Sequence, residues 1–326
     1  MRKLRYLPPV IIVVAVLCIA LVRNLRGDGE YCSDSALMMD TLVEVSVWGK
    51  ARVSPQAGVD SAMAAIAAID RLFGGGTVSA ASARSVLESE EFGDIILRAT
   101  EVHSLSGGLF DPTIGKVSRL WTFGEDSKIP PTDSLREALK SVGLSRYLAD
   151  PGSGEFVLDL GGIAKGYAVE LAAKKLGRLG FRSAIINAGG DMRLVGKRPD
   201  GKPWRIAIRH PRREGAFIGY LELENVAVAT SGDYERCFFV DGRRYHHILD
   251  PRTGMPGGAS VSVTVVGPDG SLCDALATAL FLIGHGDGRE LVESLPGVGA
   301  VFVFADGESL EATNNLASKF ERAGLE

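Results

Sequence analysis

The sequence predicts an α+β protein with mainly antiparallel sheets and flanking helices. Short apolar strand candidates dominate its second half, Asp-Gly hairpin turns join several of them, and amphipathic helical stretches lie between them. Hairpins exclude a purely parallel, doubly wound sheet, because parallel strands need long crossover connections. No repeat, low-complexity tract or Pro/Ser-rich linker divides the body of this 326-residue chain.

Residues 1–29 are expected to form a separate export signal or membrane anchor. Three basic residues among the first five precede an apolar run at 7–22, which only two prolines interrupt. This run is longer than a usual signal core but shorter than the roughly 20 residues that span a bilayer comfortably. We expect an N-terminal hydrophobic helix that anchors the protein in the inner membrane, with residues 30–326 as one domain on the periplasmic side. A buried helix of a cytosolic domain is the alternative.

The first half of the body alternates helices with few strands. Residues 41–48 alternate as a strand, and apolar residues from 59 to 73 follow helical spacing up to three consecutive glycines. Further helices are predicted over 94–103 and over 132–142, where a Thr-Asp pair is expected to cap the first turn. Residues 166–179 form another amphipathic helix, which the following glycine ends.

The second half is richer in strands. The strand candidates are 183–186, 192–195, 205–209, 217–223, 226–229, 238–240, 244–248, 261–266, 301–304 and 310–313. Asp-Gly pairs at 200–201, 241–242 and 306–307 predict hairpin turns between neighbouring strands. A largely apolar helix is predicted over 272–283.

Composition excludes several function classes. After residue 26 the chain carries 31 basic and 40 acidic residues, whereas nucleic-acid binding uses clustered Lys and Arg. We therefore expect no nucleic-acid partner. The four cysteines lack CxxC spacing and the five histidines lack HExxH, so a zinc module is not expected either.

The segment DLGGIAKG at 159–166 is the first candidate site. It follows an apolar strand end and opens a helix, so backbone N–H groups and Lys165 face an anion together. The segment matches neither GxGxxG nor GxxxxGK[ST], which disfavours a Rossmann or Walker site. A plain glycine turn that begins a helix is the structural alternative.

Two loops have equally open interpretations. NAGGD at 187–191 is either an Asx turn that joins a hairpin or part of a binding site. TSGDYER at 230–236 is either a loop between strands or a cradle for a ribose or phosphate group.

His246 and His247 are neighbours on the strand predicted over 244–248. Neighbouring residues of a strand point to opposite faces, so this pair does not chelate one metal easily. We expect one ring to face a site, where it can move protons near neutral pH, and the other to face solvent.

Asp274 and Thr278 are four residues apart in a predicted helix. They therefore lie on one face, one turn apart. A carboxylate and a hydroxyl near a helix start are hard oxygen donors suited to Mg²⁺. An N-capping Asp with an incidental Thr is the structural alternative.

Taken together, the motifs resemble those of the ApbE family, the FAD:protein FMN transferases, in both order and spacing. The motifs are GLFDPTIG (108–115), LWTFG (120–124), DLGGIAKGYA (159–168), NAGGD (187–191), ATSGDYER (229–236), HILDPRTGMP (247–256) and DALATAL (274–280). The resemblance covers the chain from about residue 38 to its end. It implies an ApbE-like, T-fold-like body.

The resemblance also implies an activity and its cofactors. Members are exported, depend on Mg²⁺, cut the pyrophosphate of FAD and attach FMN through a phosphoester to a Thr or Ser of an acceptor flavoprotein, releasing AMP. Roles then follow for matching positions. The implied Mg²⁺ ligands are Asp274, Thr278 and the carbonyl of Ala164, the implied catalytic residues are His247 and Asp274, and the FAD pocket is lined by Met39, Leu109, Phe110, Asp111, Lys165 and Ile248.

Two departures from the family pattern concern the flavin end of the pocket. Members usually start their first strand with Met-Gly-Thr, whereas Met39 is followed here by Asp40 and Thr41. The stretch after Phe73 is shorter and lacks an aromatic-polar-Asn pattern.

Two other functions are alternatives: a Mg²⁺-dependent FAD pyrophosphatase that yields FMN and AMP, and a non-catalytic, membrane-anchored FAD-binding protein. The set of Asp274, Thr278 and His247 argues against the second, because simple storage of flavin needs no metal.

Overall fold

A large antiparallel sheet forms the centre of the protein. The computed structural model describes residues 31–73, 76–79, 88–124, 126–150 and 156–323. The order of the eight strands is β1-β2-β5-β6-β9-β12-β13-β14, and each pairing is antiparallel. Their bounds are β1 Tyr31–Met38, β2 Thr41–Trp48, β5 Ser183–Ala188, β6 Asp191–Gly196, β9 Ala227–Gly232, β12 Ser262–Gly267, β13 Gly299–Val303 and β14 Leu310–Ala312. The predicted α+β class with mainly antiparallel sheets and flanking helices is therefore confirmed for the described residues.

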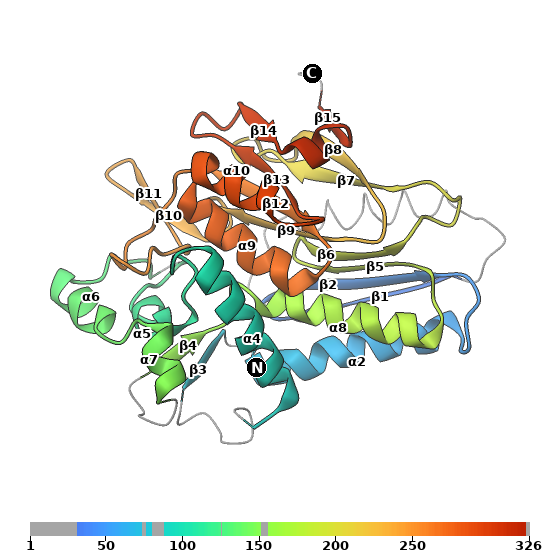
Figure 1. Ribbon diagram of the computed structural model, residues 1–326, viewed down its shortest axis with the longest axis horizontal. Coiled ribbons are helices and arrows are strands. Elements are labelled where there is room, and N and C mark those ends of the chain that lie inside the picture. The colour runs from blue at the N-terminus through green and yellow to red at the C-terminus, as the bar shows by residue number, and fades with distance from the viewer. Residues whose placement is uncertain (1–30, 74–75, 80–87, 125, 151–155, 324–326) are drawn as a thin grey trace.

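Helices cover one face of this sheet (Figure 1). They are α2 Pro55–Phe73, α4 Glu90–Leu105, α8 Ala164–Leu179, α9 Gly270–Ile283 and, near β13, α10 His285–Ser294. Alternate residues of β2, such as Val43 and Val45, are fully buried against them. Ile66 and Phe281 belong to the same core, so the apolar face of each helix is covered by the sheet or by another helix.

A smaller sheet packs on the opposite face of the large one. Its order is β15-β8-β7, with β7 Trp204–Arg209, β8 Phe217–Leu223 and β15 Phe320–Arg322, and the short helix α11 Asn314–Ala317 precedes β15. Val301 and Val303 point to this second core, whereas their neighbour Phe302 points to the helices. The two faces of β13 thus pack into two different cores, which explains why its sequence is apolar throughout.

The hairpin predicted at Asp200-Gly201 is wrong. The turn itself forms, since Gly201 has a φ of +78° and its N–H donates to the carbonyl of Arg198 over 2.9 Å. The strands on its two sides, β6 and β7, nevertheless belong to different sheets. Local turn chemistry specifies the bend but not the strand that pairs after it.

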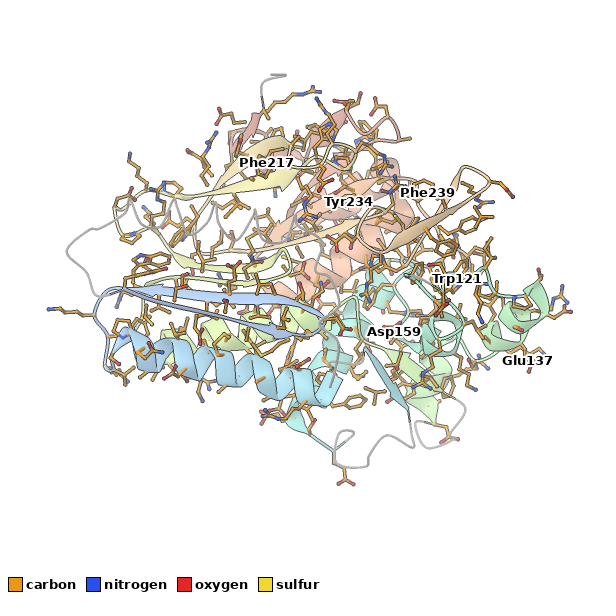
Figure 2. The ribbon with its side chains drawn as sticks, turned by 180° about the vertical axis from the view of Figure 1, so that it is seen from behind. Trp121, Glu137, Asp159, Phe217, Tyr234 and Phe239 are labelled. Atoms are coloured by element: carbon orange, nitrogen blue, oxygen red, sulfur yellow. The ribbon has the colours of Figure 1, made fainter. Side chains whose placement is uncertain are left out.

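The remaining elements gather beside the large sheet. They are β3 Thr77–Ser79 paired with β4 Val157–Asp159, the 3₁₀ turn η1 Pro112–Ile114, α5 Gly115–Ser118, α6 Thr132–Leu139, α7 Leu144–Ala149, and the hairpin β10 Cys237–Val240 with β11 Arg243–His246. Asp241 and Gly242 both have positive φ, as a two-residue hairpin turn requires, and this prediction is confirmed. In Figure 2, Trp121 and Phe239, a residue of β10, lie on the same side of the molecule.

Two further expectations are corrected or lie outside the described residues. Helix α6 begins after Pro131, and no side chain caps it, so the predicted cap at Thr132 and Asp133 does not form. The anchor predicted at 1–29 lies outside the described residues. No helix among those described is long and apolar enough to cross a membrane.

Candidate functional site

The glycine-rich segment between β4 and α8 holds the start of α8 against α9. Asp159, at the end of β4 and labelled in Figure 2, accepts a hydrogen bond from the N–H of Gly161 over 2.9 Å. A Cβ on Gly162 would lie 3.1 Å from Oγ1 of Thr278 and 3.3 Å from the ring of Phe110. The absent side chain at Gly162 therefore lets the loop approach Thr278 closely.

Helices α8 and α9 cross with their backbones in contact. A Cβ on Gly166 would lie 2.1 Å from the carbonyl oxygen of Gly270, and a Cβ on Gly270 would lie 2.4 Å from that of Gly166. At the crossing, the N–H of Gly166 donates to Oδ2 of Asp274 over 2.9 Å. Asp274, which is 4% exposed, is thus held at the positive N-terminal end of α8.

The predicted metal ligands come from segments in contact with one another. Ala164 lies between Gly162, which abuts Thr278, and Gly166, which donates to Asp274. Oγ1 of Thr278 is also 3.2 Å from Oγ of Ser231 in β9. A carboxylate, a hydroxyl and a carbonyl form a hard-oxygen donor set that fits Mg²⁺. Among the described residues, no group of three or more His, Cys, Asp or Glu side chains is arranged to hold a metal.

Lys165 is paired with the last residue of the NAGGD loop, to which the sequence assigned no role of its own. Its Nζ forms a short ion pair with Asp191, the first residue of β6, which is 2% exposed. Asp191 also accepts a hydrogen bond from the N–H of Thr230 in β9 over 3.4 Å. Asp191 therefore belongs to the site, because its carboxylate contacts Lys165 of α8 and Thr230 of β9. From the sequence alone it stands only at the end of the NAGGD turn.

The charges of this cluster shift one another's pKa values. Burial, followed by the charge of Asp191, raises the pKa of Asp274 to about 7, while Lys165 and the N–H of Gly166 oppose that shift. Burial alone would lower the pKa of Lys165, but the charges of Asp191 and Asp274 raise it well above its usual value. Two buried carboxylates thus share one ammonium group, so a further positive charge beside them would stabilise the cluster.

His247 lies at the end of the β10–β11 hairpin, one residue beyond β11. Its N–H donates to the carbonyl of Arg236 over 3.1 Å, and its ring meets the ring of Phe123 edge-on at 6.5 Å. Its buried Nδ1 has no hydrogen-bond partner among the described residues. Burial lowers the pKa of His247 to about 3, and the positive charge of Arg236 and of Lys165 adds to that shift. The ring is therefore neutral and lies within electrostatic range of the Lys165 cluster.

The predicted division of the two histidines is wrong in one respect. His246 is 7% exposed and packs edge-on against Phe281 at 5.4 Å, so it does not face solvent. Its Nδ1 accepts a hydrogen bond from the N–H of Ile248 over 3.3 Å. Strand β11 ends at His246, so the alternation expected within a strand does not extend to His247.

The buried neutral state of His246 predicts a pH-dependent stability. Burial lowers its pKa from 6.5 to about 4. Between these values the unfolded chain binds a proton that the folded chain excludes, so the free energy of unfolding falls as the pH falls, by about 3 kcal/mol in total. We expect His246→Gln, which retains a hydrogen-bond acceptor, to flatten this dependence.

Urea unfolding at pH 7 and pH 4.5 measures this effect. His247 titrates in both proteins, and the charge of His246 is one of the causes that lower its pKa, so the difference between their pH slopes reports on His246 together with its coupling to His247. Identical slopes for the wild type and His246→Gln would contradict the assignment.

The residues expected to line the flavin pocket have diverse surroundings. Phe110 and Ile248 are buried in the main core, and Met39 and Leu109 are partly buried against it. Oδ1 of Asp111 accepts hydrogen bonds from the N–H and the hydroxyl of Thr113, and its Oδ2 accepts one from the N–H of Leu144. This carboxylate holds the start of η1 and α7, and its contact with FAD stays a prediction.

The two open loops have different outcomes. The N–H of Gly190 donates to Oδ1 of Asn187 over 2.9 Å, so the side chain of Asn187 closes the turn of the β5–β6 hairpin. The bond spans three residues rather than the two of an Asx turn. The last residue of NAGGD, Asp191, nevertheless reaches the site. Thr230 and Ser231 lie in β9 rather than in a loop, and Ser231 contacts Thr278. The sequence signal for this residue is its position: Asp191 directly follows the paired glycines Gly189 and Gly190.

In this mainly antiparallel α+β fold Lys165 lies at the N-terminus of α8, an arrangement typical of proteins that bind anionic ligands. The model of the ApbE family matches residues 39–302, which is most of the sequence. The chain belongs to the ApbE family, and the resemblance seen in its motifs is thereby confirmed.

Curated relatives and solved structures agree with this membership. A FAD:protein FMN transferase of Haemophilus influenzae is 34% identical over 220 residues, which are 63% of this chain and 64% of that protein. One of Treponema pallidum is 35% identical over 236 residues, 65% of each. The chain thus spans just under two thirds of the length of these relatives. The ApbE protein of Thermotoga maritima superposes with a TM-score of 0.75 at 33% identity, covering 87% of this chain and 97% of that one.

Proposed function

We propose that this protein transfers FMN from FAD to a Thr or Ser hydroxyl of an acceptor flavoprotein, through a phosphoester bond, and releases AMP. The observation that carries the proposal is the meeting of Asp274, Thr278 and Lys165 at the N-terminus of α8. The curated relatives, named FAD:protein FMN transferases, support it. Such a site neutralises a pyrophosphate, which is the group that this transfer must break.

The oxygen donors of the site suit Mg²⁺, which Asp274, Thr278 and the carbonyl of Ala164 would hold. When bound, Mg²⁺ would act as a Lewis acid that stabilises negative charge on the pyrophosphate. Lys165 adds a fixed positive charge beside it, and its pairing with Asp191 limits where the ammonium group can move. Met39, Leu109, Phe110, Asp111 and Ile248 would line the FAD pocket.

His247 would receive the proton of the attacking hydroxyl. A threonine hydroxyl is a weak nucleophile at its own pKa, so a neighbouring base must remove its proton as the oxygen–phosphorus bond forms. His247 is neutral, and its Nδ1 is without a partner among the described residues, so a lone pair is free for that proton. Burial makes the ring a weak base with a pKa of about 3, and the negative charge of a bound pyrophosphate would raise that pKa. The bond from the FMN phosphorus to the bridging oxygen then breaks, and AMP leaves with that oxygen.

The setting of the reaction is part of the proposal. The basic and apolar segment at 1–29 supports an inner-membrane anchor, with the catalytic domain on the periplasmic side. The acceptor would then be an exported flavoprotein subunit or domain with a Thr or Ser site.

Incubation of the purified protein with FAD, Mg²⁺ and a flavoprotein acceptor domain tests the activity. We expect a mass increase of one FMN on the acceptor and an equal amount of AMP, because the transfer releases one AMP for each adduct. Intact protein mass spectrometry and nucleotide chromatography measure the two products. AMP without the adduct would show a FAD pyrophosphatase instead, and intact FAD would leave only flavin binding.

A further inference from the structure

The carboxylate of Glu170 is buried between α8, α9 and β6. Its Oε2 accepts hydrogen bonds from Nε of Arg193 over 2.9 Å and from the N–H of Gly270 over 3.1 Å. Glu170 is 6% exposed, and the side chain of Arg193 is 12% exposed. Neither residue belongs to the motifs that predicted the site, and among the described residues no hydrogen bond or ion pair joins either of them to Asp274. Their buried ion pair therefore needs a separate explanation.

Glu170 fastens the beginning of α9 to α8. Gly270 is the first residue of α9, and its N–H is one of the groups that a helix leaves without an internal partner. Its hydrogen bond to Glu170 closes the glycine crossing, where the backbones of Gly166 and Gly270 touch. One turn further along α9, Asp274 rests on the N–H of Gly166. The position of Asp274 relative to α8 thus depends on the Gly166–Gly270 contact, which the hydrogen bond to Glu170 stabilises.

Two ion pairs of opposite polarity fix α8 along β6. Lys165 of α8 pairs with Asp191 of β6, while Glu170 of α8 pairs with Arg193 of β6. Asp191 and Arg193 are two residues apart and so lie on the same face of the strand. If α8 slid until Lys165 faced Arg193, or Glu170 faced Asp191, like charges would meet in a buried layer. The observed register is therefore the one that pairs opposite charges.

We infer that Glu170 and Arg193 are positioning residues that hold the Asp274–Thr278 face of α9 in the geometry that binds the divalent cation. This inference rests on the proposed function. The pair acts through the Gly166–Gly270 crossing and touches neither substrate nor metal. Residues that orient metal ligands from behind commonly change metal affinity by about 10–100-fold when they are replaced.

The test is the Mg²⁺ dependence of Glu170→Gln. The amide can still accept from Gly270 but removes the charge that holds Arg193. We expect the Mg²⁺ concentration that gives half of the maximal rise in melting temperature to increase about tenfold. The Mg²⁺ concentration for half-maximal AMP release should shift equally, while kcat at saturating Mg²⁺ stays within about threefold of the wild type, as a positioning role requires.

Two further variants keep the test decisive. Glu137→Gln removes an exposed ion pair with Lys140 and serves as the matched control, which we expect to leave both Mg²⁺ concentrations unchanged. Arg193→Lys preserves the positive charge but loses the planar guanidinium group with its fixed N–H donors. It should therefore raise both half-maximal Mg²⁺ concentrations as well, by a smaller factor. It also replaces Glu170→Gln if that variant does not fold.

Each remaining outcome contradicts a specific statement. A lower melting temperature with unchanged Mg²⁺ dependence in Glu170→Gln and Arg193→Lys would reduce the pair to a structural role and overturn the inference alone. A wild-type protein that transfers FMN without any response to Mg²⁺ would overturn the inference together with the metal assignment. A wild type that responds to Mg²⁺ in melting temperature but transfers no FMN would overturn the proposed function and leave the positioning role standing.

Discussion

Asp274→Asn is expected to lower the rate of AMP release at least 100-fold at saturating FAD. The substitution removes the anionic oxygen that would bind Mg²⁺, and electrostatic groups of this kind commonly contribute factors of about 10²–10³. FAD affinity should change far less, because the predicted flavin contacts lie on other elements. Initial rates with and without Mg²⁺, together with FAD titration by fluorescence, measure both effects.

Stability provides the control for this substitution. The amide oxygen of Asn can still accept from the N–H of Gly166. Its neutrality removes the cost of burying a charge and the repulsion by Asp191, which together raise the pKa of Asp274. The melting temperature in the absence of Mg²⁺ should therefore equal or exceed that of the wild type. Undiminished activity in a folded Asp274→Asn protein would refute the metal assignment.

Lys165→Met is expected to impair both stability and activity. It leaves Asp191 as a buried carboxylate without its cation, next to a second carboxylate, Asp274. Removing one partner of a buried ion pair commonly costs about 3–5 kcal/mol. FMN transfer should also fall by about 100-fold, because the fixed charge beside the pyrophosphate is lost. Chemical denaturation and acceptor labelling measure the two losses.

A second substitution separates these two roles of Lys165. In Lys165→Met with Asp191→Asn, the carboxylate of Asp274 no longer faces a second carboxylate and still accepts from the N–H of Gly166, so most of the lost stability should return. Activity should not return, because the neutral pair supplies no positive charge to the phosphates. Recovery of transfer along with stability would mean that Lys165 acts only through the fold.

Much of the fold follows from local patterns in the sequence. Strand β8 and the hairpin turn at Asp241-Gly242 lie where alternation and turn chemistry place them. Strand β1 was not predicted, because it is a polar edge strand in which Leu37 is 65% exposed. Its pattern carries no buried face, and only its pairing with β2 stabilises it as a strand.

The candidate site could be predicted only where its geometry is local. Asp274 and Thr278 share a helix face, so their spacing alone places them together. The pairing of Lys165 with Asp191 depends on how α8 lies across β6, and no period within either element specifies that. Glu170 was missed for the same reason, since its partners Arg193 and Gly270 come from two other elements.

Helix α9 also contains a thiol directly before Asp274. Cys273 is fully buried, and a Cβ on Gly267 would lie 2.9 Å from its Sγ. Burial raises the pKa of Cys273 well above its usual value, so the thiol is unreactive in the closed protein. Alkylating reagents can reach it only after α9 lifts away from β9 and α8. The alkylation rate of Cys273 therefore measures how often the helix layer opens transiently, and no label needs to be introduced for this measurement.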